Sequence, residues 1–413
     1  MSVAKRQWVS PAGESKESWV VRYTDNGGRR RLKTFRLKKQ ADDFEARAVI
    51  GVKEGTHVPD SASATVAAAG KLWLAKASAD GLERGTVDDY RRHYRLHIVP
   101  FLGTKKLSQL TVPAIRSFED ALREDGRSSV MVRKVLTSLG SLIADAQERG
   151  LVAHNVVRDA RSRRKRGKDR RHEKRHRGKL KVGVDIPTPA EVKALVGVLE
   201  GHWRPLLLTA IFTGLRASEL RGLRWTDVDL NRHEIHVRQR ADIYNDIGAP
   251  KSEAGERSIP MPSVVTNAIR EWKLKCPRPA TGQMDAQGNP VKVLDLVFPN
   301  GNGNVENRAN MVNRGLHPAW VAAGVCVDSG KRDEDGGPIM VAKYQGLHCL
   351  RHFFASWCIN RKVDGGLELP LKVTQERLGH SSIQMTADTY GHLFARGDDG
   401  GALAEAAAAF FGN

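Results

Sequence analysis

The residues able to do chemistry gather in the C-terminal half of this chain. His348 and Arg351 fall in the run HCLRH, His380 and Tyr390 follow it, and Arg216 precedes it in the run TGLRASEL. Guanidinium groups stay protonated at every working pH and donate paired hydrogen bonds to phosphate oxygens, whereas a phenol can attack phosphorus as a nucleophile. Imidazoles exchange protons near neutral pH. These residue types predict phosphoryl transfer through a protein tyrosine, without a metal.

Cleaving a phosphodiester by direct displacement needs a nucleophile, neutralisation of the developing charge and a proton for the departing 5′ oxygen. We expect Tyr390 to be the nucleophile and Arg216 with Arg351 to neutralise the charge. His348 and Arg351 share one helix face at i and i+3, so one element can present both to a phosphate. Glu219, one helical turn after Arg216, is a candidate to orient its guanidinium. The alternative for Arg216 and Glu219 is an ordinary exposed ion pair.

Two further residues complete the set. His380 follows a glycine at an expected helix start, where backbone amides and the dipole favour an anion; a capping histidine is the alternative. Lys251 is the only lysine between positions 201 and 271, on the loop of a hairpin expected from residues 234–240 and 257–261. We expect it to be the general acid, with its pKa lowered by desolvation or by nearby arginines. A solvated loop lysine is the alternative.

Other residues of the same types are expected to be structural. His352 follows Arg351 but points in a different direction from the helix. His348 and His352 stand one helical turn apart, yet the glutamate of an H-E-x-x-H zinc helix is missing, which argues against a metal site. The remaining tyrosines lie in expected strands and helices or lack the spacing: Tyr23, Tyr90, Tyr94, Tyr244 and Tyr344.

The chain resembles the tyrosine recombinases, or lambda-type integrases, whose characteristic set is Arg, Lys, His-x-x-Arg, His or Trp, and Tyr. The matching residues here are Arg216, Lys251, His348, Arg351, His380 and Tyr390. The resemblance extends from about residue 65 to about residue 395, and the family's pattern also places its lysine on a hairpin loop. These six residues make up five motif elements in order, which over such a length is far more specific than a lone H-x-x-R.

The resemblance implies a site-specific DNA recombinase that forms a 3′-phosphotyrosyl link and a free 5′ hydroxyl. The bond energy is conserved, so no cofactor is implied. It further implies a homotetramer on double-stranded DNA with attachment-type sites, exchanging strands through a four-way junction. The arm-like N-terminal segment adds integration and excision of a mobile element, with a DNA-bending protein and a directionality factor as partners.

Composition indicates a polyanionic partner. The 413 residues carry a formal net charge of +20, and 40% of them are hydrophobic, enough for the cores of two or three domains. Nucleic acid is the first candidate partner and a membrane surface is the competitor, but the chain lacks the roughly 18 consecutive apolar residues of a spanning helix. The N-terminus also lacks the apolar core of a signal peptide. We expect a cytoplasmic protein of a bacterium or phage, nucleoid-associated when bound, with four reduced, buried cysteines.

The expected fold is multidomain and mainly α. Period-two alternation around a Gly-rich turn predicts a small N-terminal β-sheet from residues 19–23 and 29–36, followed by a helix at 38–52. Helical periodicity then predicts a core-binding bundle, with helices at 66–79, 86–98, 112–124 and 128–149. A mixed α+β, mostly helical catalytic domain follows, with helices at 189–199 and 205–213, the strands named above, and exposed loops at 299–304 and 328–337.

A strongly basic run separates the bundle from the catalytic domain. Between positions 158 and 181 there are fourteen Lys or Arg and three Asp or Glu, a net 14 − 3 = +11. Such a run cannot build a core, so it is either a strap along DNA or a solubilising linker. The expected segments are an arm-type DNA-binding-like domain at 1–58, a core-binding domain at 65–157, a basic linker at 158–186, a catalytic domain at 187–396 and a tail helix at 397–413.

Candidate DNA contacts are the basic residues of the first hairpin, the bundle and the linker. They are Arg29, Arg30, Arg31, Arg91, Arg92, Arg163, Arg164, Lys165 and Arg166. Two other functions remain open at this point. A type IB topoisomerase uses a similar residue set but reseals its own strand, and a catalytically silent DNA-binding protein would only occupy or bend its sites.

Overall fold

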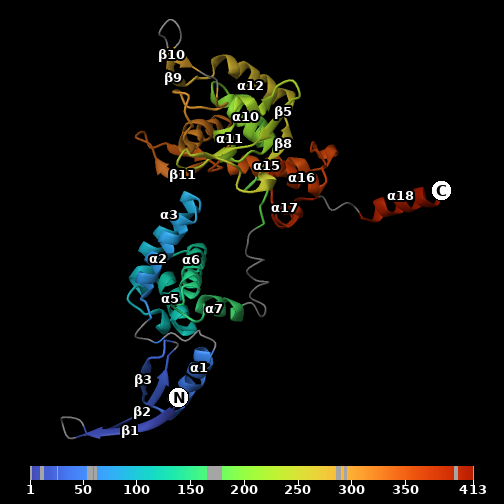
Figure 1. The fold of residues 1–413 in the computed structure, drawn as a ribbon. Helices are drawn as coiled ribbons and strands as arrows, with labels where there is room; N and C mark the ends of the chain where they lie inside the picture. Colours follow the sequence, from blue (N-terminus) through green and yellow to red (C-terminus); the bar gives the residue numbers. More distant parts are fainter. Residues whose placement is uncertain are drawn as a thin grey trace. The chain divides into compact units, whose positions relative to one another are not determined.

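The computed structural model divides the chain into two compact units, Met1–Arg177 and Gly178–Asn413, each described here by itself (Figure 1). It describes residues 2–9, 14–25, 27–53, 59, 63–164, 179–284, 290–292, 295–394 and 399–412. Both units are mostly helical, as expected for a multidomain, mainly α protein. No helix within these ranges is long and apolar enough to cross a membrane.

The first unit begins with a three-stranded antiparallel sheet in the order β1-β2-β3, with α1 packed against β2. The elements are β1 Ser2–Val9, β2 Ser15–Thr24, β3 Arg30–Phe35 and α1 Lys38–Lys53. The predicted hairpin is β2 and β3, and β1 is an additional strand. Val21, Tyr23 and Ala41 form a small buried core on one face of the sheet. Asp25 closes the turn by accepting hydrogen bonds from the backbone of Gly27 and Arg29.

A helical bundle completes the first unit. Its elements are α2 Val66–Ala79, α3 Arg84–His93, the π-helix η1 Tyr94–Ile98, α4 Val99–Leu102, the 3-10 turn η2 Leu107–Gln109, α5 Val112–Glu124, α6 Ser129–Glu148 and α7 Val156–Arg164. Thr65, Thr111 and Ser128 cap α2, α5 and α6, each accepting a hydrogen bond from the backbone N–H three residues later. These caps explain why the predicted helix starts agree closely with the structure. The predicted helix at 86–98 is α3 continued by η1.

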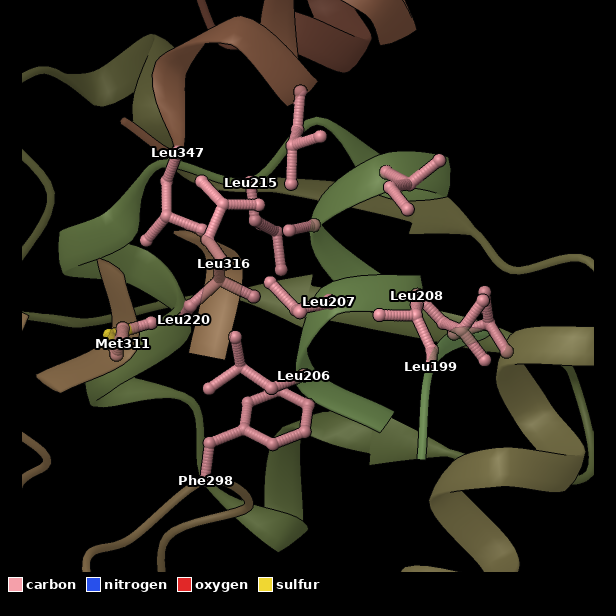
Figure 2. Close-up of a cluster of buried hydrophobic side chains, with 14 of the residues drawn as sticks. Leu199, Leu206, Leu207, Leu208, Leu215, Leu220, Phe298, Met311, Leu316 and Leu347 are labelled. Atoms are coloured by element: carbon pink, nitrogen blue, oxygen red, sulfur yellow. The ribbon is translucent and has the colours of Figure 1, made fainter. Parts of the chain in front are cut away.

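The second unit is built around α10, which is apolar on nearly every side and therefore buried. Its helices are α9 Pro189–Val198, α10 Trp203–Thr213, α11 Ala217–Gly222, α12 Ser263–Lys275, α13 Arg308–Asn310, the π-helix η5 Met311–Leu316, α14 His317–Ala322, α15 His348–Ile359, α16 Leu371–Leu378, α17 Ile383–Tyr390 and α18 Asp399–Phe411. Short 3-10 turns are η3 Trp225–Asp227, η4 Glu253–Gly255, η6 Lys362–Asp364 and η7 Gly391–Leu393. Figure 2 shows leucines of α10 among Phe298, Met311 and Leu316 in the buried cluster. Helices α12 and α15 pack against α10, so this core fixes the helix that carries the HCLRH run.

The strands of the second unit form small separate sheets. They are β4 Val228–Asp229, β5 Glu234–Val237, β6 Arg240–Ala241, β7 Ile247–Gly248, β8 Arg257–Pro260, β9 Ala280–Met284, β10 Pro290–Lys292, β11 Cys326–Arg332 and β12 Pro338–Ala342. The predicted pairing of the β5 and β8 regions is present, in a sheet of order β4-β5-β8. The connection between them also contains a β6-β7 hairpin, which the sequence did not predict.

The prediction of an exposed loop at residues 328–337 is wrong for part of that segment. Residues 326–332 pair antiparallel with residues 338–342 as β11 and β12, and only residues 333–337 at the tip form a turn. The apolar residues Ile339, Met340 and Val341 favour a strand, and that strand gives the polar residues before it a partner. The Gly-containing segment at 299–304 is a turn, closed by a bridge between Pro299 and Val305.

Candidate active site

The end of α16 organises the candidate site, because three successive backbone carbonyls there each accept a hydrogen bond from an arginine. Arg257 donates to the carbonyl of Arg377, with 2.7 Å between Nε and oxygen. Arg351 donates to the carbonyl of Leu378. Arg216 Nη2 donates to the carbonyl of the next residue at 3.0 Å. The last carbonyls of a helix lack partners within the helix and carry its negative dipole end, so they stabilise a group of like-charged guanidiniums.

Arg216 stands at the start of α11, where its backbone and side chain both engage Glu219. The backbone N–H of Arg216 donates to Glu219 Oε2 at 2.9 Å, and its Nη1 donates to Oε1 at 2.7 Å. The Arg216 side chain is 35% exposed, so it reaches solvent while one edge is fixed. The predicted orienting contact from Glu219 is therefore present.

Glu219 is shared between two arginines. Arg257, the first residue of β8, donates from Nη2 to Glu219 Oε2 at 2.9 Å and from Nη1 to Oε1 at 3.2 Å. Desolvation opposes ionisation of Glu219, but the charges and hydrogen bonds of Arg257 and Arg216 outweigh it and hold the pKa of this carboxyl below its usual value. Arg257 was missed by the sequence reasoning, which treated it only as the start of a strand.

Arg351 is buried, at 2% exposure, on α15. Its Nη1 donates to the carbonyl of Gly214 at 2.7 Å, which joins α15 to the end of α10. Gly214 adopts φ 61°, and a Cβ there would collide with the ring of Phe354, so the turn requires glycine. Burial, reinforced by the charge of Arg216, lowers the pKa of Arg351 to about 9. The guanidinium stays protonated at neutral pH, with its orientation fixed by backbone acceptors.

Tyr390 is the last residue of α17 and lies inside the same cluster, 1% exposed. Its hydroxyl forms a hydrogen bond with Nδ1 of His352, at 2.7 Å. Its ring is stacked parallel to that of His380, with 6.3 Å between centroids. Burial raises the pKa of Tyr390 to about 12, and the charges of Arg351 and Arg216 act in the opposite direction. The phenol is protonated at neutral pH.

His380 lies in the bend between α16 and α17. The sequence reasoning placed it at a helix start, but the cap of α17 is Ser382, whose side chain accepts from the backbone N–H of Met385. A capping role for His380 is therefore wrong. Its Nδ1 is instead hydrogen-bonded to Thr386 Oγ1 at 2.9 Å. The backbone N–H of His380 donates to the carbonyl of Gln375, and its carbonyl accepts from the side-chain amide of Gln375. Burial, with the charges of Arg351 and Arg216, lowers the pKa of His380 to about 4.

His348 begins α15 and is exposed, whereas Arg351 on the same helix is buried. Its ring lies edge-on to that of His352, with 4.5 Å between centroids. The surrounding protein removes water from part of the imidazole, and this desolvation, together with the charges of Arg351 and Arg216, lowers the pKa of His348. The structure thus brings six of the predicted residues into one cluster: Arg216, Glu219, His348, Arg351, His380 and Tyr390.

Lys251 lies on an exposed segment between β7 and the 3-10 turn η4. The segment is attached to the cluster, because Gly255 in η4 accepts a hydrogen bond from Arg257 Nη1 at 2.9 Å. Buried Arg221 holds the neighbouring hairpin by donating to the carbonyl of Asp242 at 2.6 Å. Lys251 is therefore carried by a surface loop whose base is anchored in the site.

The predicted DNA-contacting residues that the structure describes lie in the first unit. Arg29 and Arg30 are exposed beside the first turn, while Arg31 is paired with Asp25 at 2.7 Å. Arg91 and Arg92 on α3 are exposed and form i,i+3 ion pairs with Asp88 and Asp89. Arg163 and Arg164 end α7, and Lys165 and Arg166 lie outside the described residues.

The sequence argued against a metal site and predicted four reduced, buried cysteines. Within the described ranges, no three His, Cys, Asp or Glu side chains are grouped as a metal site. Cys276, Cys349 and Cys358 are buried thiols and Cys326 is half-buried. Burial raises the pKa of Cys349 to about 12, so this thiol beside His348 is an inert core residue.

Comparison with known proteins gives two family matches. Residues 188–396 match the phage integrase family, and residues 66–122 match the N-terminal SAM-like domain of phage integrases. The XerC-like tyrosine recombinase of Caldanaerobacter subterraneus subsp. tengcongensis is 25% identical over 408 residues, covering 95% of this chain and 96% of that protein. The ICEBs1 integrase of Bacillus subtilis is 22% identical over 304 residues, covering 72% of this chain and 71% of that protein.

Solved structures share the fold. The Tn1549 transposon integrase in complex with transposon right end DNA superposes with a TM-score of 0.57 at 20% identity, covering 83% of this chain and 98% of that one. A lambda integrase dimer bound to a COC′ core site superposes with a TM-score of 0.51 at 15% identity, covering 95% of each chain.

Proposed function

We propose that Tyr390 is the nucleophile with which this protein breaks DNA strands. The premise is that the chain belongs to the phage integrase family of tyrosine recombinases, which are site-specific DNA recombinases. In the same proposal Arg216 and Arg351 hold the scissile phosphate. Membership in this family favours recombination over the topoisomerase and the silent DNA-binding protein that the sequence left open.

One observation carries the proposal: the buried phenol of Tyr390 lies in a cluster with guanidiniums and imidazoles of its own chain. The charges of Arg351 and Arg216 both act on its pKa. A protein that only binds DNA has no need of a buried tyrosine hydroxyl among arginines. An enzyme that esterifies a phenol to phosphorus needs both a charge clamp and a route for the proton.

The reaction follows from the chemistry of these groups. The phenolic oxygen attacks phosphorus, and the bond from phosphorus to the 5′ oxygen breaks, which leaves a 3′-phosphotyrosyl link. Arg216 and Arg351 neutralise the charge that develops on the phosphorus oxygens, and His348 and His380 add hydrogen bonds to the same phosphate. Lys251 delivers a proton to the departing oxygen. Attack by a 5′ hydroxyl of a second duplex reverses these steps and completes the exchange.

The finer assignment is integration and excision of a mobile element by a homotetramer on attachment-type DNA sites. The relatives named as integrases, including that of the Tn1549 transposon, favour this assignment. The net charge of +20 suits prolonged contact with DNA, for which Arg29, Arg30, Arg31, Arg91 and Arg92 in the first unit and residues 163–166 are the candidates. A DNA-bending protein and a directionality factor are the expected partners.

A nicked suicide substrate tests the nucleophile. Loss of the short strand beyond the cut prevents rejoining, so the wild-type protein accumulates a covalent DNA adduct that survives denaturation. Tyr390→Phe should abolish the adduct and leave DNA affinity nearly unchanged. Tyr344→Phe is the matched control, since Tyr344 is also buried but hydrogen-bonds Glu191. An adduct that persists in Tyr390→Phe would exclude Tyr390 as the nucleophile.

The second half of the test asks what happens after cleavage. Two duplexes carrying the same site, distinguished by length, should yield hybrid products. Relaxation of supercoils without hybrid products would instead indicate an enzyme that only reseals its own strand.

A further inference from the structure

We infer that His352 receives the phenolic proton of Tyr390 when the tyrosine attacks, an inference that rests on the proposed role of Tyr390. His352 is a second catalytic histidine of α15, and its role differs from that of His348. From its place in the sequence alone, His352 was expected to be structural.

The contact between the two residues joins two helices. His352 comes from the first turns of α15 and Tyr390 from the last position of α17, and 2.7 Å separates Nδ1 from the hydroxyl oxygen. That separation is normal for a hydrogen bond of a hydroxyl, and the rings meet edge to face at 5.7 Å. The hydroxyl of Tyr390 therefore has a defined partner before any DNA is bound.

The other two imidazoles are placed for different tasks. Nδ1 of His380 is occupied by Thr386, and its ring lies parallel to the Tyr390 ring, so it faces the phenol with its π surface and not with a nitrogen. His348 is exposed and lies against the ring of His352. His352 is thus the imidazole whose nitrogen is aimed at the reacting oxygen.

Burial and nearby positive charge keep His352 neutral at working pH. Burial makes the largest contribution, and His348 and Arg351 on the same helix add to it, so that the pKa of His352 falls to about 4. Asp185, ahead of α9, acts in the opposite direction, and Tyr390 faces the ring from α17. A neutral imidazole has one N–H and one lone pair. With the hydrogen on Nε2, the lone pair on Nδ1 points at the phenol.

The proton inventory of the step is balanced. The O–H bond of Tyr390 breaks and its proton moves to Nδ1 of His352, while the oxygen forms a bond to phosphorus and the 5′ oxygen leaves with a proton from Lys251. A bound phosphate offsets the positive charges of Arg351 and Arg216, which increases the basicity of His352 when the substrate is in place. In rejoining, the imidazolium returns the proton to the departing phenol.

Three variants separate proton acceptance from simple positioning. His352→Phe removes the acceptor, whereas His352→Asn keeps an oxygen near the position of Nδ1 but cannot take up a proton. Both should form the covalent adduct more slowly in a single turnover, by on the order of 10²-fold, with DNA affinity unchanged. The control is His392→Asn. His392 lies two residues after Tyr390, and its ring is hydrogen-bonded to the backbone carbonyl of Leu180. This control should react at the wild-type rate.

Each outcome has one meaning. A wild-type rate in His352→Phe, with an adduct that still requires Tyr390, overturns the inference and leaves the proposed function intact. Full rescue by His352→Asn overturns proton acceptance, because an amide can only orient the phenol. An adduct that survives in Tyr390→Phe overturns both proposals together.

A spectroscopic measurement does not depend on catalysis or on the stability of a variant. Nitrogen NMR of the full chain labelled in its imidazoles, assigned with His352→Asn, reports which ring nitrogen carries the hydrogen. The expected result at pH 7 is hydrogen on Nε2 and a bare Nδ1. Hydrogen on Nδ1 would make His352 the donor to Tyr390 and overturn the inference.

Discussion

Arg216 donates a hydrogen bond to the backbone carbonyl of Gly379, 3.0 Å from Nη2, across 163 positions of sequence. The next residue along the chain is His380, and α17 then leads to Tyr390. One bond therefore ties the proposed phosphate clamp to the segment that carries the proposed nucleophile. The site is a tertiary assembly in which arginines and the end of α16 support one another.

Glu219→Gln should destabilise the second unit. The substitution removes a buried negative charge shared by Arg216 and Arg257 and leaves Arg257, itself buried, without a counter-charge. Breaking a buried ion pair in this way costs about 3 kcal/mol or more of the free energy of unfolding. Asp364→Asn is the control, because its ion pair with Arg361 is exposed and screened by solvent, so its loss should change the free energy of unfolding little. Denaturant unfolding of the full chain compares the two; equal losses would contradict the prediction.

The same carboxylate predicts a pH dependence. Since the folded state lowers the pKa of Glu219 below its ordinary value of 4.5, its stabilisation is present above that value. It is lost as the pH falls through the folded pKa. The wild-type chain should therefore lose stability on acidification below about pH 4.5 more steeply than Glu219→Gln. Denaturant midpoints of both chains measured from pH 6 downward test this. Parallel curves for the two chains would contradict the prediction.

Gly379→Ala should impair adduct formation as well as stability. Gly379 adopts φ 63°, and a Cβ there would stand 2.8 Å from Arg257 Nη1 and 3.0 Å from the carbonyl oxygen of Ala254. The strain is of the order of 1–3 kcal/mol, and relieving it would displace Arg257 or the bend that precedes His380. Gly391→Ala is the matched control, because its backbone is helical and nothing lies within 4 Å of the added carbon. Equal adduct yields from the two variants would be the contrary result.

Lys251→Ala should slow cleavage of ordinary DNA because the departing 5′ oxygen loses its proton donor. A substrate with sulfur in place of that bridging oxygen should restore the rate, since a thiolate leaves without protonation. Lys275→Ala, at the exposed end of α12, provides a control for the loss of one surface charge. Adduct formation on both substrates, measured in a single turnover, decides the role. Absence of rescue would remove Lys251 from the acid role.

Replacing residues 163–166, which read Arg-Arg-Lys-Arg, by alanine should weaken the salt dependence of DNA binding. Each phosphate contact that is lost reduces the slope of log affinity against log salt by about 0.9. Affinity should fall similarly for specific and random DNA, because phosphate contacts carry no sequence information. Titrations at several salt concentrations measure the slope. An unchanged slope would make the run a spacer.

The sequence predicted the elements that depend on local signals. Thr65, Thr111 and Ser128 stand just ahead of apolar helical periodicity, and each caps its helix. The β5-β8 pairing was also predicted, and in β5 the buried Ile235 and Val237 alternate with less buried polar residues. β1 and the β11-β12 hairpin also pair with strands close by in the sequence. They were not predicted because most of their residues are exposed and show no clear alternation of apolar and polar side chains.

The candidate site divides in the same way. Arg216, His348, Arg351, His380 and Tyr390 have recognisable types in a recognisable order, so their grouping could be expected. The residues that hold them could not. Arg257 in β8 pairs with Glu219 in α11, which lies 38 positions away in the sequence. His352 in α15 contacts Tyr390 in α17, also 38 positions away. Which side of α15 meets α17 depends on the packing of the whole unit, which helical periodicity alone does not specify.

The placement of the phenol beside its own arginines has a genetic consequence. Two inactive alleles, one lacking Tyr390 and the other lacking Arg351, would not complement each other when expressed in one cell. In the proposed homotetramer, every protomer would lack either the attacking oxygen or one of the cations at the strand it holds, so no mixture of the two would contain an intact centre. Mixed assemblies with the normal allele would likewise stall wherever a defective copy is seated.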